Sequence, residues 1–357
     1  MHSRNRLKKL FKHPYFLGGF IFLALLISAS LIHGLVFHGK IPVSTWLYNN
    51  EGQMIAKGPF NPLDVPPLGT DPIGQHIFFI LLQGAKYTIG IAVLVAALRV
   101  IVSSFVGLIF GDFLSRLNKY ISGLVNGFYF IPTALLCYIL LFDVIVLPSG
   151  FVEEYSFMQK VVFELIILTV VAIPTTSLLI GNQVNHVYKE EYITTAKTLG
   201  GGRFHLLKKH VLPYMWPRLL IQFIQEIVQV LVLLIHLGVF HVLFGGTLVK
   251  AIDDSQNAYI SVSSEWSGVV GKGLEHLGGW TWNFFGPMIA FMLVILAFNF
   301  MIKGMEDVLL GETRIAKKTM EQPLTKKDAK RKREAFNFAF IHDHGDHTGA
   351  RRPDTPE

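Results

Sequence analysis

Long apolar runs alternate with short polar segments along the chain up to about residue 312. The hydrocarbon core of a bilayer is about 30 Å thick, so a helix that crosses it needs about 20 mostly apolar residues. The first run is longer than the ~7–15 apolar residues of a signal peptide, so we interpret it as a retained anchor. The pattern predicts an all-α integral membrane protein with six transmembrane helices, at residues 15–37, 87–113, 121–147, 159–181, 216–244 and 283–302.

The composition agrees with this pattern. Of the 357 residues, 51% are hydrophobic and only 16% are charged, whereas about a quarter of the residues in a soluble domain carry charge. A water-soluble enzyme is therefore excluded. The single cysteine, Cys137, excludes a disulfide scaffold and a cysteine-based zinc site.

The positions of the basic residues predict the orientation in the membrane. If the amino terminus is cytoplasmic, 25 of the 32 lysines and arginines fall in cytoplasmic segments, as the positive-inside rule expects. Both termini are then cytoplasmic, with a basic tail at residues 1–14, an extracellular loop at 38–86 and a second tail at 313–357. The net charge of +7 is explained by this topology, so we expect no nucleic-acid partner.

The cytoplasmic segment at about residues 187–213 has the pattern of two short helices. Residues 187–199 suit an amphipathic helix that begins with acidic residues, and Gly200-Gly201-Gly202 ends it, because glycine enters the left-handed region without penalty. A second helix is predicted from Arg203 to His210, stopped by Pro213. The segment is longer than a plain connection requires, so we expect a protruding helical knob.

This segment resembles the EAA loop of the permeases of ABC importers, in the form found in the oligopeptide, dipeptide and nickel family. The matching residues are Thr194-Thr195-Ala196, Gly200 and Val211-Leu212-Pro213. Further matches are Gly69-Thr70-Asp71 with Gly74-Gln75-His76, Glu265-Trp266, and Leu296-Ala297-Phe298-Asn299. The resemblance covers about residues 15–312 and is to the second, C-type permease of the pair.

The resemblance implies a type I importer architecture with residues 87–312 as the permease core in the plasma membrane. Its implied partners are a second permease, two ATPase subunits that bind ATP and Mg²⁺, an extracellular substrate-binding protein and membrane lipid. The knob would then contact an ATPase and transmit its nucleotide-driven motion. The residues expected in this coupling role are Glu191, Thr194, Thr195, Ala196, Lys197, Gly200, Arg203, Leu212 and Pro213.

The sequence departs from the family pattern at three places in these motifs. Thr194 stands where the family has glutamate, Gln75 stands where it has arginine, and a triple glycine replaces a single one. A looser contact with the ATPase, or one made through Lys197 and Arg203, would follow. The chain also has no Walker A sequence, so we expect no cofactor on this chain and ATP hydrolysis by a partner.

Charged residues at bilayer depth are costly and rarely stand alone. Arg99 lies in the middle of the second predicted span and Glu226 lies in the fifth, so we predict that they pair. Helical spacing puts a polar stripe on one side of the fifth span. The stripe would line the translocation path, face the second permease or hold the bundle together; its members are Gln222, Gln225, Glu226, Gln229 and His236.

The carboxyl-terminal tail carries the sequence His342-Asp343-His344-Gly345-Asp346-His347, which matches a metallo-β-lactamase signature. That fold needs about 200 further residues, and only ten follow His347, so the hydrolase interpretation fails. We predict no metal site there, with His342, His344, Asp346 and His347 as weak ligands for a divalent ion at most.

The main prediction is thus a permease subunit of an ABC importer for peptides or a related solute. Three alternatives stay open at this point: an exporter subunit on the same scaffold, a regulatory or degenerate permease, and a polytopic membrane enzyme. The extracellular loops at 38–86 and about 245–282 are expected to contact the binding protein or the second permease.

Overall fold

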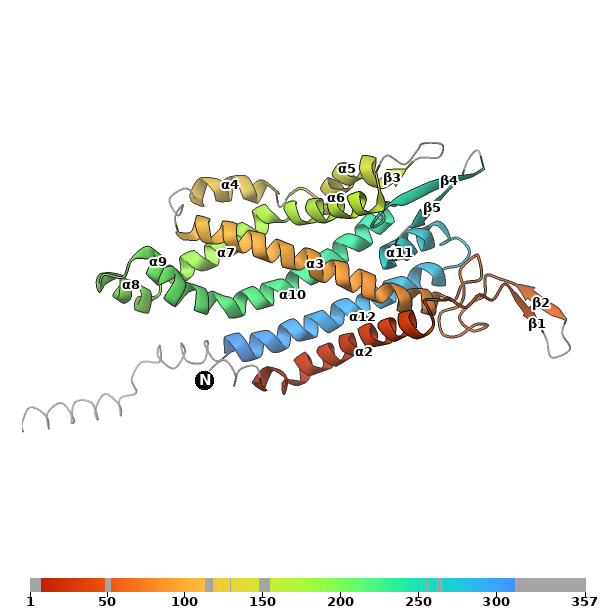
Figure 1. The fold of residues 1–357 in the computed structure, drawn as a ribbon, viewed down its shortest axis with the longest axis horizontal. Helices are drawn as coiled ribbons and strands as arrows, with labels where there is room; N and C mark the ends of the chain where they lie inside the picture. The colour runs from red at the N-terminus through yellow and green to blue at the C-terminus, as the bar shows by residue number, and fades with distance from the viewer. Residues whose placement is uncertain are drawn as a thin grey trace, which may run out of the picture. The chain divides into compact units, whose positions relative to one another are not determined.

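The computed structural model describes residues 8–48, 53–112, 118–128, 130–147, 155–253, 256–261, 263 and 265–311. The internal contacts divide the chain into two units, Met1–Leu309 and Leu310–Glu357. The described residues belong almost entirely to the first unit, which is a bundle of long helices (Figure 1). The tail at 313–357 and its histidine-rich sequence lie outside the described residues.

Four helical stretches of the described chain are long and apolar enough to cross a membrane. They contain α2 (Pro14–Val36), α3 (Ile77–Asp112), α10 (Leu212–Val239) and α12 (Trp282–Met305). These correspond to the first, second, fifth and sixth predicted spans. With two bent helix pairs counted as one span each, the described residues hold up to six spans.

The third and fourth predicted spans are not single helices. The span predicted at 121–147 overlaps α4 (Asn118–Phe128) and α5 (Thr133–Ile145), with a bend of 73° between them. The span predicted at 159–181 overlaps α6 (Phe157–Val170) and α7 (Ile173–Tyr188), with a bend of 41°. Pro132 precedes α5 and Pro174 lies in the first turn of α7. A proline has no N–H to give to the preceding turn, so the prediction of two continuous helices was wrong at these prolines.

The second span begins at Ile77, ten residues before the predicted start, so the loop predicted at 38–86 is shorter than expected. Gly84 and Lys86 reduce the local hydropathy, but α2 supplies partners for the polar groups nearby. His33 Nδ1 lies 3.2 Å from Gln83 Oε1, and the N–H of Lys86 donates to Ser30 Oγ at 3.3 Å. Contacts between two helices therefore extend α3 beyond its apolar run.

The prediction of a short helix from Arg203 that Pro213 stops was also wrong. α9 (Arg203–Leu206) continues through the π-helical turn η1 (Leu207–Val211) into α10, so that Arg203–Val239 is one stretch. The N–H of Leu212 bonds the carbonyl of Leu207, five residues earlier. Pro213 lies within the first two positions of α10, and this wider turn accommodates a residue that has no backbone N–H.

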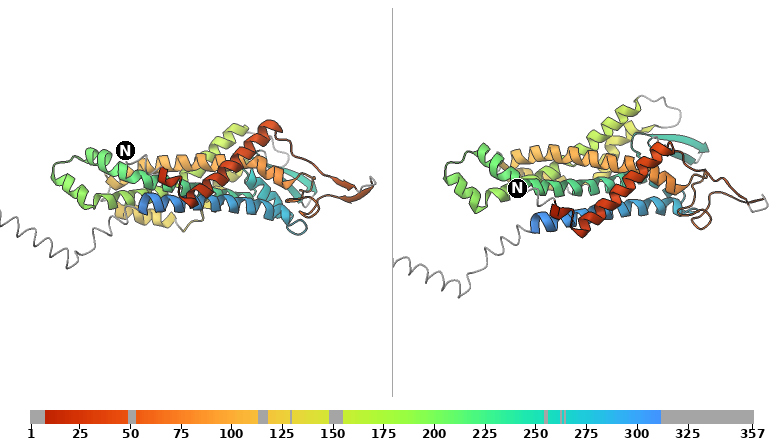
Figure 2. Two further views of the ribbon diagram at one scale, coloured as in Figure 1. Left: turned by 90° about the horizontal axis from the view of Figure 1, so that it is seen from below. Right: turned by 60° about the horizontal axis from the view of Figure 1, so that its bottom comes forward.

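Small residues bring α3 close to α7, the two helices that contact each other most extensively. A Cβ added to Gly107 would lie 2.7 Å from the carbonyl oxygen of Ser177, and one added to Gly111 would lie 2.8 Å from Val184. Side chains at these positions would push the helices apart, as at other close crossings in membranes. α3 also packs against α2, α6 and α10, and α2 packs against α12 (Figure 2).

Short strands and an additional helix are confined to one end of this unit, opposite α8 and α9 (Figure 1). β1 (Trp46–Tyr48) pairs antiparallel with β2 (Met54–Lys57); β3 (Val146–Leu147) runs parallel to β4 (Thr247–Asp253), which pairs antiparallel with β5 (Gln256–Ser261). α11 (Trp266–Glu275) follows and packs against α10 and α12. The described part of the predicted loop at 245–282 therefore contains two strands and a helix.

Candidate functional site

The helical knob predicted at 187–213 is present and is anchored to the bundle. α8 (Glu191–Thr198) follows α7 directly. Its one buried side chain is Ile193, which is 1% exposed and belongs to an apolar cluster with Val184 of α7 and Met215 of α10. Ile193 therefore packs α8 against two membrane helices.

The turn between α8 and α9 has a defined geometry. Gly200 has a φ of +88°, its N–H bonds the carbonyl of Lys197 at 3.1 Å, and the N–H of Gly201 bonds the carbonyl of Ala196 at 3.1 Å. These two bonds form a Schellman motif. A Cβ on Gly201 would lie 2.8 Å from the Ala196 oxygen, whereas a Cβ on Gly202 would meet nothing within 4 Å. Two of the three glycines are thus required by this turn.

The outer face of the knob exposes apolar side chains. Leu199 is 85% exposed and Phe204 is 71% exposed, and they flank the glycine turn. Leu199, Phe204 and Ile193 were not among the predicted coupling residues, although their apolar type was readable in the sequence.

The predicted coupling residues all lie on or beside this knob. Ala196 is half-buried, and the other eight are exposed: Glu191, Thr194, Thr195, Lys197, Gly200, Arg203, Leu212 and Pro213. The hydroxyls of Thr194 and Thr195 donate to the Glu191 carbonyl at 2.8 and 2.9 Å. Thr194 stands where the family has glutamate, and its hydroxyl therefore donates its hydrogen bond within α8.

The knob meets α10 through aromatic rings as well. The rings of Tyr192 and Tyr214 lie 6.5 Å apart, and the Arg218 guanidinium lies over the Tyr214 ring at 4.8 Å. Burial, followed by the neighbouring Tyr214, raises the pKa of Tyr192 above its ordinary value. Tyr192 is consequently neutral across the physiological range.

A cluster of buried polar groups lies in the interior of the helix bundle. Arg99 of α3 is 2% exposed and Glu226 of α10 is 1% exposed, and Arg99 Nη1 lies 3.3 Å from Glu226 Oε2. The predicted pairing of these two residues is confirmed by this contact. Glu226 Oε1 also accepts from Thr176 Oγ1 at 2.9 Å and from Gln222 Nε2 at 3.0 Å.

The bend between α6 and α7 supplies the remaining partner of Arg99. The N–H of Ala172 bonds the carbonyl of Thr169 instead of that of Leu168, so the Leu168 carbonyl loses its usual donor within the helix. Arg99 Nε and Nη2 donate to this oxygen at 2.8 and 2.6 Å. The cluster thus joins α3, α6, α7 and α10, and each buried charge is compensated.

The polar stripe of α10 is divided between two environments. Gln222 and Glu226 are buried in the cluster, where they hold helices together. Gln225 is half-buried, and Gln229 and His236 are exposed on the surface of this single chain. The structure therefore separates the five residues that the helical spacing grouped.

The metal-ligating side chains of the tail, His342, His344, Asp346 and His347, lie outside the described residues. Among the residues that the structure does describe, no group of three or more histidine, cysteine, aspartate or glutamate side chains is placed to hold a metal ion.

Comparisons with known proteins agree with the resemblance to the permeases of ABC importers. A family model described as binding-protein-dependent transport system inner membrane component matches residues 103–314. The probable D,D-dipeptide transport system permease protein DdpC of Escherichia coli (strain K12) is 25% identical over 241 residues, which cover 68% of this chain and 72% of that protein. The oligopeptide transport system permease protein OppC of Bacillus subtilis (strain 168) is 24% identical over 252 residues, covering 69% of this chain and 73% of that protein. The dipeptide transport system permease protein DppC of the same strain is 22% identical over 242 residues, covering 68% of this chain and 67% of that protein.

Proposed function

This chain belongs to the family of binding-protein-dependent transport system inner membrane components, and we propose that it forms half of the translocation path of an ABC importer for short peptides. It is a multi-pass protein of the plasma membrane. Peptide cargo is proposed because the relatives named above are permeases of dipeptide and oligopeptide transport systems.

The proposed assembly contains a second permease subunit, two ATPase subunits and an extracellular binding protein. ATP and Mg²⁺ bind the ATPase subunits and not this chain, in keeping with the absence of a Walker A sequence. The side of α10 that carries the half-buried Gln225 and the exposed Gln229 and His236 is proposed to face the path or the second permease. Exposed polar groups on a membrane helix favour such a setting over contact with lipid.

The geometry of the knob is the observation that best supports the proposed contact with an ATPase. Its exposed Leu199 and Phe204 form an apolar contact surface, while Ile193 ties α8 to α7 and α10. An ATPase that binds Leu199 and Phe204 would move α8 as a rigid body. The buried cluster around Ile193 would transmit that motion to the spans. In such a coupling the knob and the spans have two arrangements, and nucleotide binding to the ATPase favours one of them.

Site-directed crosslinking tests the contact with the ATPase. A cysteine at the exposed Thr198 should crosslink to a co-purified ATPase, with an efficiency that changes between the ATP-bound and nucleotide-free states. The native Cys137 has no exposed surface, and a Cys137→Ser background removes it entirely. The matched control is a cysteine at Met54, which is 58% exposed on β2 at the opposite end.

The two positions should give different results. Crosslinks from position 198 and none from position 54 would support the proposal. The absence of a crosslink from position 198 in both nucleotide states would contradict it.

A further inference from the structure

A basic patch precedes α2, in the turn at residues 8–12. The side chains of Lys8, Lys9 and Lys12 are exposed, and residues 1–50 contain no aspartate or glutamate. Because α2 is long and apolar enough to cross a membrane, the residues just before it lie at the depth of the lipid headgroups. α2 begins at the end of the bundle that carries α8 and α9, which the predicted orientation places in the cytoplasm (Figure 1).

The backbone of this turn is fixed against the bundle. The N–H of Lys12 bonds the Lys9 carbonyl at 3.2 Å, and the N–H of His13 bonds the Leu10 carbonyl at 3.0 Å. The side chain of Leu10 is buried, so it ties the turn to the folded chain. A segment that is already folded loses less conformational entropy on binding than a free chain end does. The lysines are therefore presented from a preformed turn.

Aromatic rings accompany the basic residues of this turn. Phe11 lies edge-on to the rings of Phe16 and Phe20, with centroid distances of 5.4 and 5.5 Å, yet 45% of Phe11 stays exposed. Tyr15 is also exposed, and its ring lies 5.9 Å from the Phe300 ring of α12. Exposed rings beside lysines are typical of segments that lie in the membrane interface, with the rings between the lipid chains and the headgroups. This setting favours lipid as the partner of the patch.

The carboxylates that follow α12 do not neutralise the patch. Asp307, in the turn η2 (Glu306–Leu310), has Oδ1 at 3.1 Å from Lys303 Nζ and Oδ2 at 3.7 Å from His13 Nε2. Within the described part of the chain, neither Lys8 nor Lys12 forms an ion pair with a carboxylate. Their ammonium groups can therefore contact a phosphate without breaking an internal ion pair.

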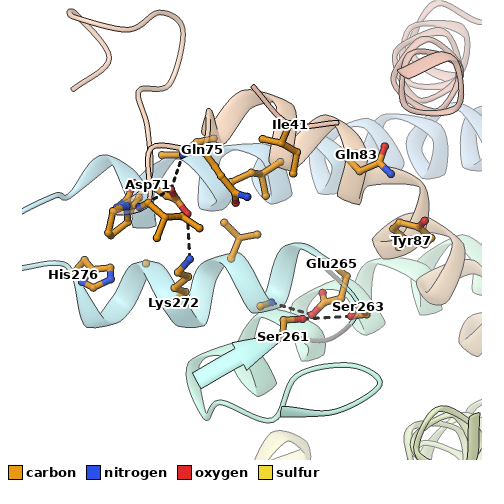
Figure 3. Close-up of a pocket in the computed structure, with 18 of the residues that line it drawn as sticks. Ile41, Asp71, Gln75, Gln83, Tyr87, Ser261, Ser263, Glu265, Lys272 and His276 are labelled. Carbon is orange, nitrogen blue, oxygen red and sulfur yellow. Dashed lines mark hydrogen bonds and ion pairs between the residues drawn. The ribbon is translucent and has the colours of Figure 1, made fainter. Parts of the chain in front are cut away.

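The charged groups around the cavity at the opposite end of the bundle are, in contrast, compensated within the chain. This cavity of about 540 Å³ lies between the loop before α3, the first turns of α3, and α11, and His276 contributes to its wall (Figure 3). Lys272 Nζ lies 3.1 Å from Asp71 Oδ2, and both oxygens of Glu265 accept from N–H groups in the first turn of α11. The cavity thus offers no comparable charge to an anion.

We propose that the patch formed by Lys8, Phe11 and Lys12 binds the headgroup of an anionic phospholipid of the inner leaflet. The phosphate contacts the two ammonium groups, and the Phe11 ring lies against the acyl chains. This interaction goes beyond the proposed transport function and involves neither the knob nor the exposed face of α10. Because lipid binding is measured without transport, a failure of either proposal leaves the other untouched.

Native mass spectrometry of the purified full-length chain tests the proposal. The micelles contain equal amounts of phosphatidylglycerol and phosphatidylcholine with the same acyl chains, so that the two probes differ in net charge. The unchanged chain should retain phosphatidylglycerol in preference to phosphatidylcholine. A Lys8→Gln, Lys12→Gln variant should lose this preference by about fivefold for each lysine. A Lys8→Arg, Lys12→Arg variant keeps both charges and should retain it.

The matched control is Lys40→Gln, at the other end of α2. Lys40 is also exposed and also lies beside a candidate span, but no exposed lysine accompanies it in residues 35–45. This variant should leave the preference for phosphatidylglycerol unchanged. A loss as large as that of the Lys8→Gln, Lys12→Gln variant would show a general attraction between lysines and anionic lipid, and would overturn the proposal.

Two further outcomes would contradict the proposed lipid site. One is equal retention of the two lipids by the unchanged chain. The other is a Lys8→Gln, Lys12→Gln variant that keeps its lipid preference but loses a co-purified ATPase, which would identify the patch as a contact with that protein.

Discussion

Removal of the Glu226 carboxylate should destabilise the protein strongly, because it leaves the Arg99 guanidinium buried and only partly compensated. In a Glu226→Ala variant, Arg99 Nη1 loses its partner at 3.3 Å, and the side chains of Thr176 and Gln222 lose their shared acceptor. Arg99 keeps only the Leu168 carbonyl. Breaking one side of a buried ion pair costs about 3–5 kcal/mol.

Two further variants isolate the contribution of the charge. Glu226→Gln retains an acceptor oxygen in nearly the same shape and should cost less, about 1–3 kcal/mol. An Arg99→Met, Glu226→Leu double variant removes both charges and should recover most of the stability, since apolar replacement of a buried pair is often neutral. The coupling energy of the two sites should be at least about 2 kcal/mol.

Equilibrium unfolding of the purified variants in mixed micelles gives the free energies of unfolding. A second test exchanges the charges, because Arg99→Glu and Glu226→Arg should each be harmful and should partly rescue each other. The reasoning would be refuted by a Glu226→Ala variant whose free energy of unfolding falls by less than about 1 kcal/mol. It would also be refuted by an Arg99→Met, Glu226→Leu variant that is no more stable than the less stable of its two single variants.

Three smaller predictions concern the knob and the outer cavity. Ile193→Ala, which removes most of the buried side chain of α8, should lower the free energy of unfolding by about 2–4 kcal/mol. It should also uncouple ATP hydrolysis from transport, as measured by the ratio of transported peptide to ATP hydrolysed. An unchanged ratio would contradict the role of Ile193. Gly200→Ala, at a φ of +88°, should destabilise by about 1 kcal/mol in the same unfolding assay, while Gly201→Ala should destabilise as well, because its Cβ would lie 2.8 Å from the Ala196 oxygen; a neutral effect of both would contradict the turn assignment. Because the pKa of His276 is lowered in the folded protein, its contribution is present above the unfolded pKa of about 6.5 and is lost as the pH falls through the folded value. His276→Gln should therefore flatten the loss of stability between neutral and acidic pH, and an unchanged pH profile would contradict this.

The buried ion pair could be predicted from the sequence because a lone charge at bilayer depth is expensive. That argument named Arg99 and Glu226 without knowing how α3 and α10 pack. It did not find the carbonyl of Leu168 as a third partner, since this oxygen is released only by the bend between α6 and α7. The bend itself had a sequence signal in Pro174, and the break before α5 had one in Pro132.

Other features depend on contacts that hydropathy does not encode. The start of α3 at Ile77 depends on His33 and Ser30 of α2, which lie about 50 residues away in the chain. Helical spacing placed Gln222 and Gln229 on one side of α10, but only the packed bundle separates the buried side chain from the exposed one. The cavity lined by Asp71, Glu265 and Lys272 brings together residues that are far apart in the chain.

ATP-driven uptake of a labelled short peptide tests the central claim most directly. The chain would be reconstituted in proteoliposomes with its co-purifying permease and ATPase subunits and with the extracellular binding protein. The account predicts peptide accumulation that needs ATP and the binding protein, and that is lost when Phe204→Asp disrupts the exposed face of the knob. Uptake that is unaffected by Phe204→Asp, or ATP-driven movement of the peptide in the outward direction only, would contradict it.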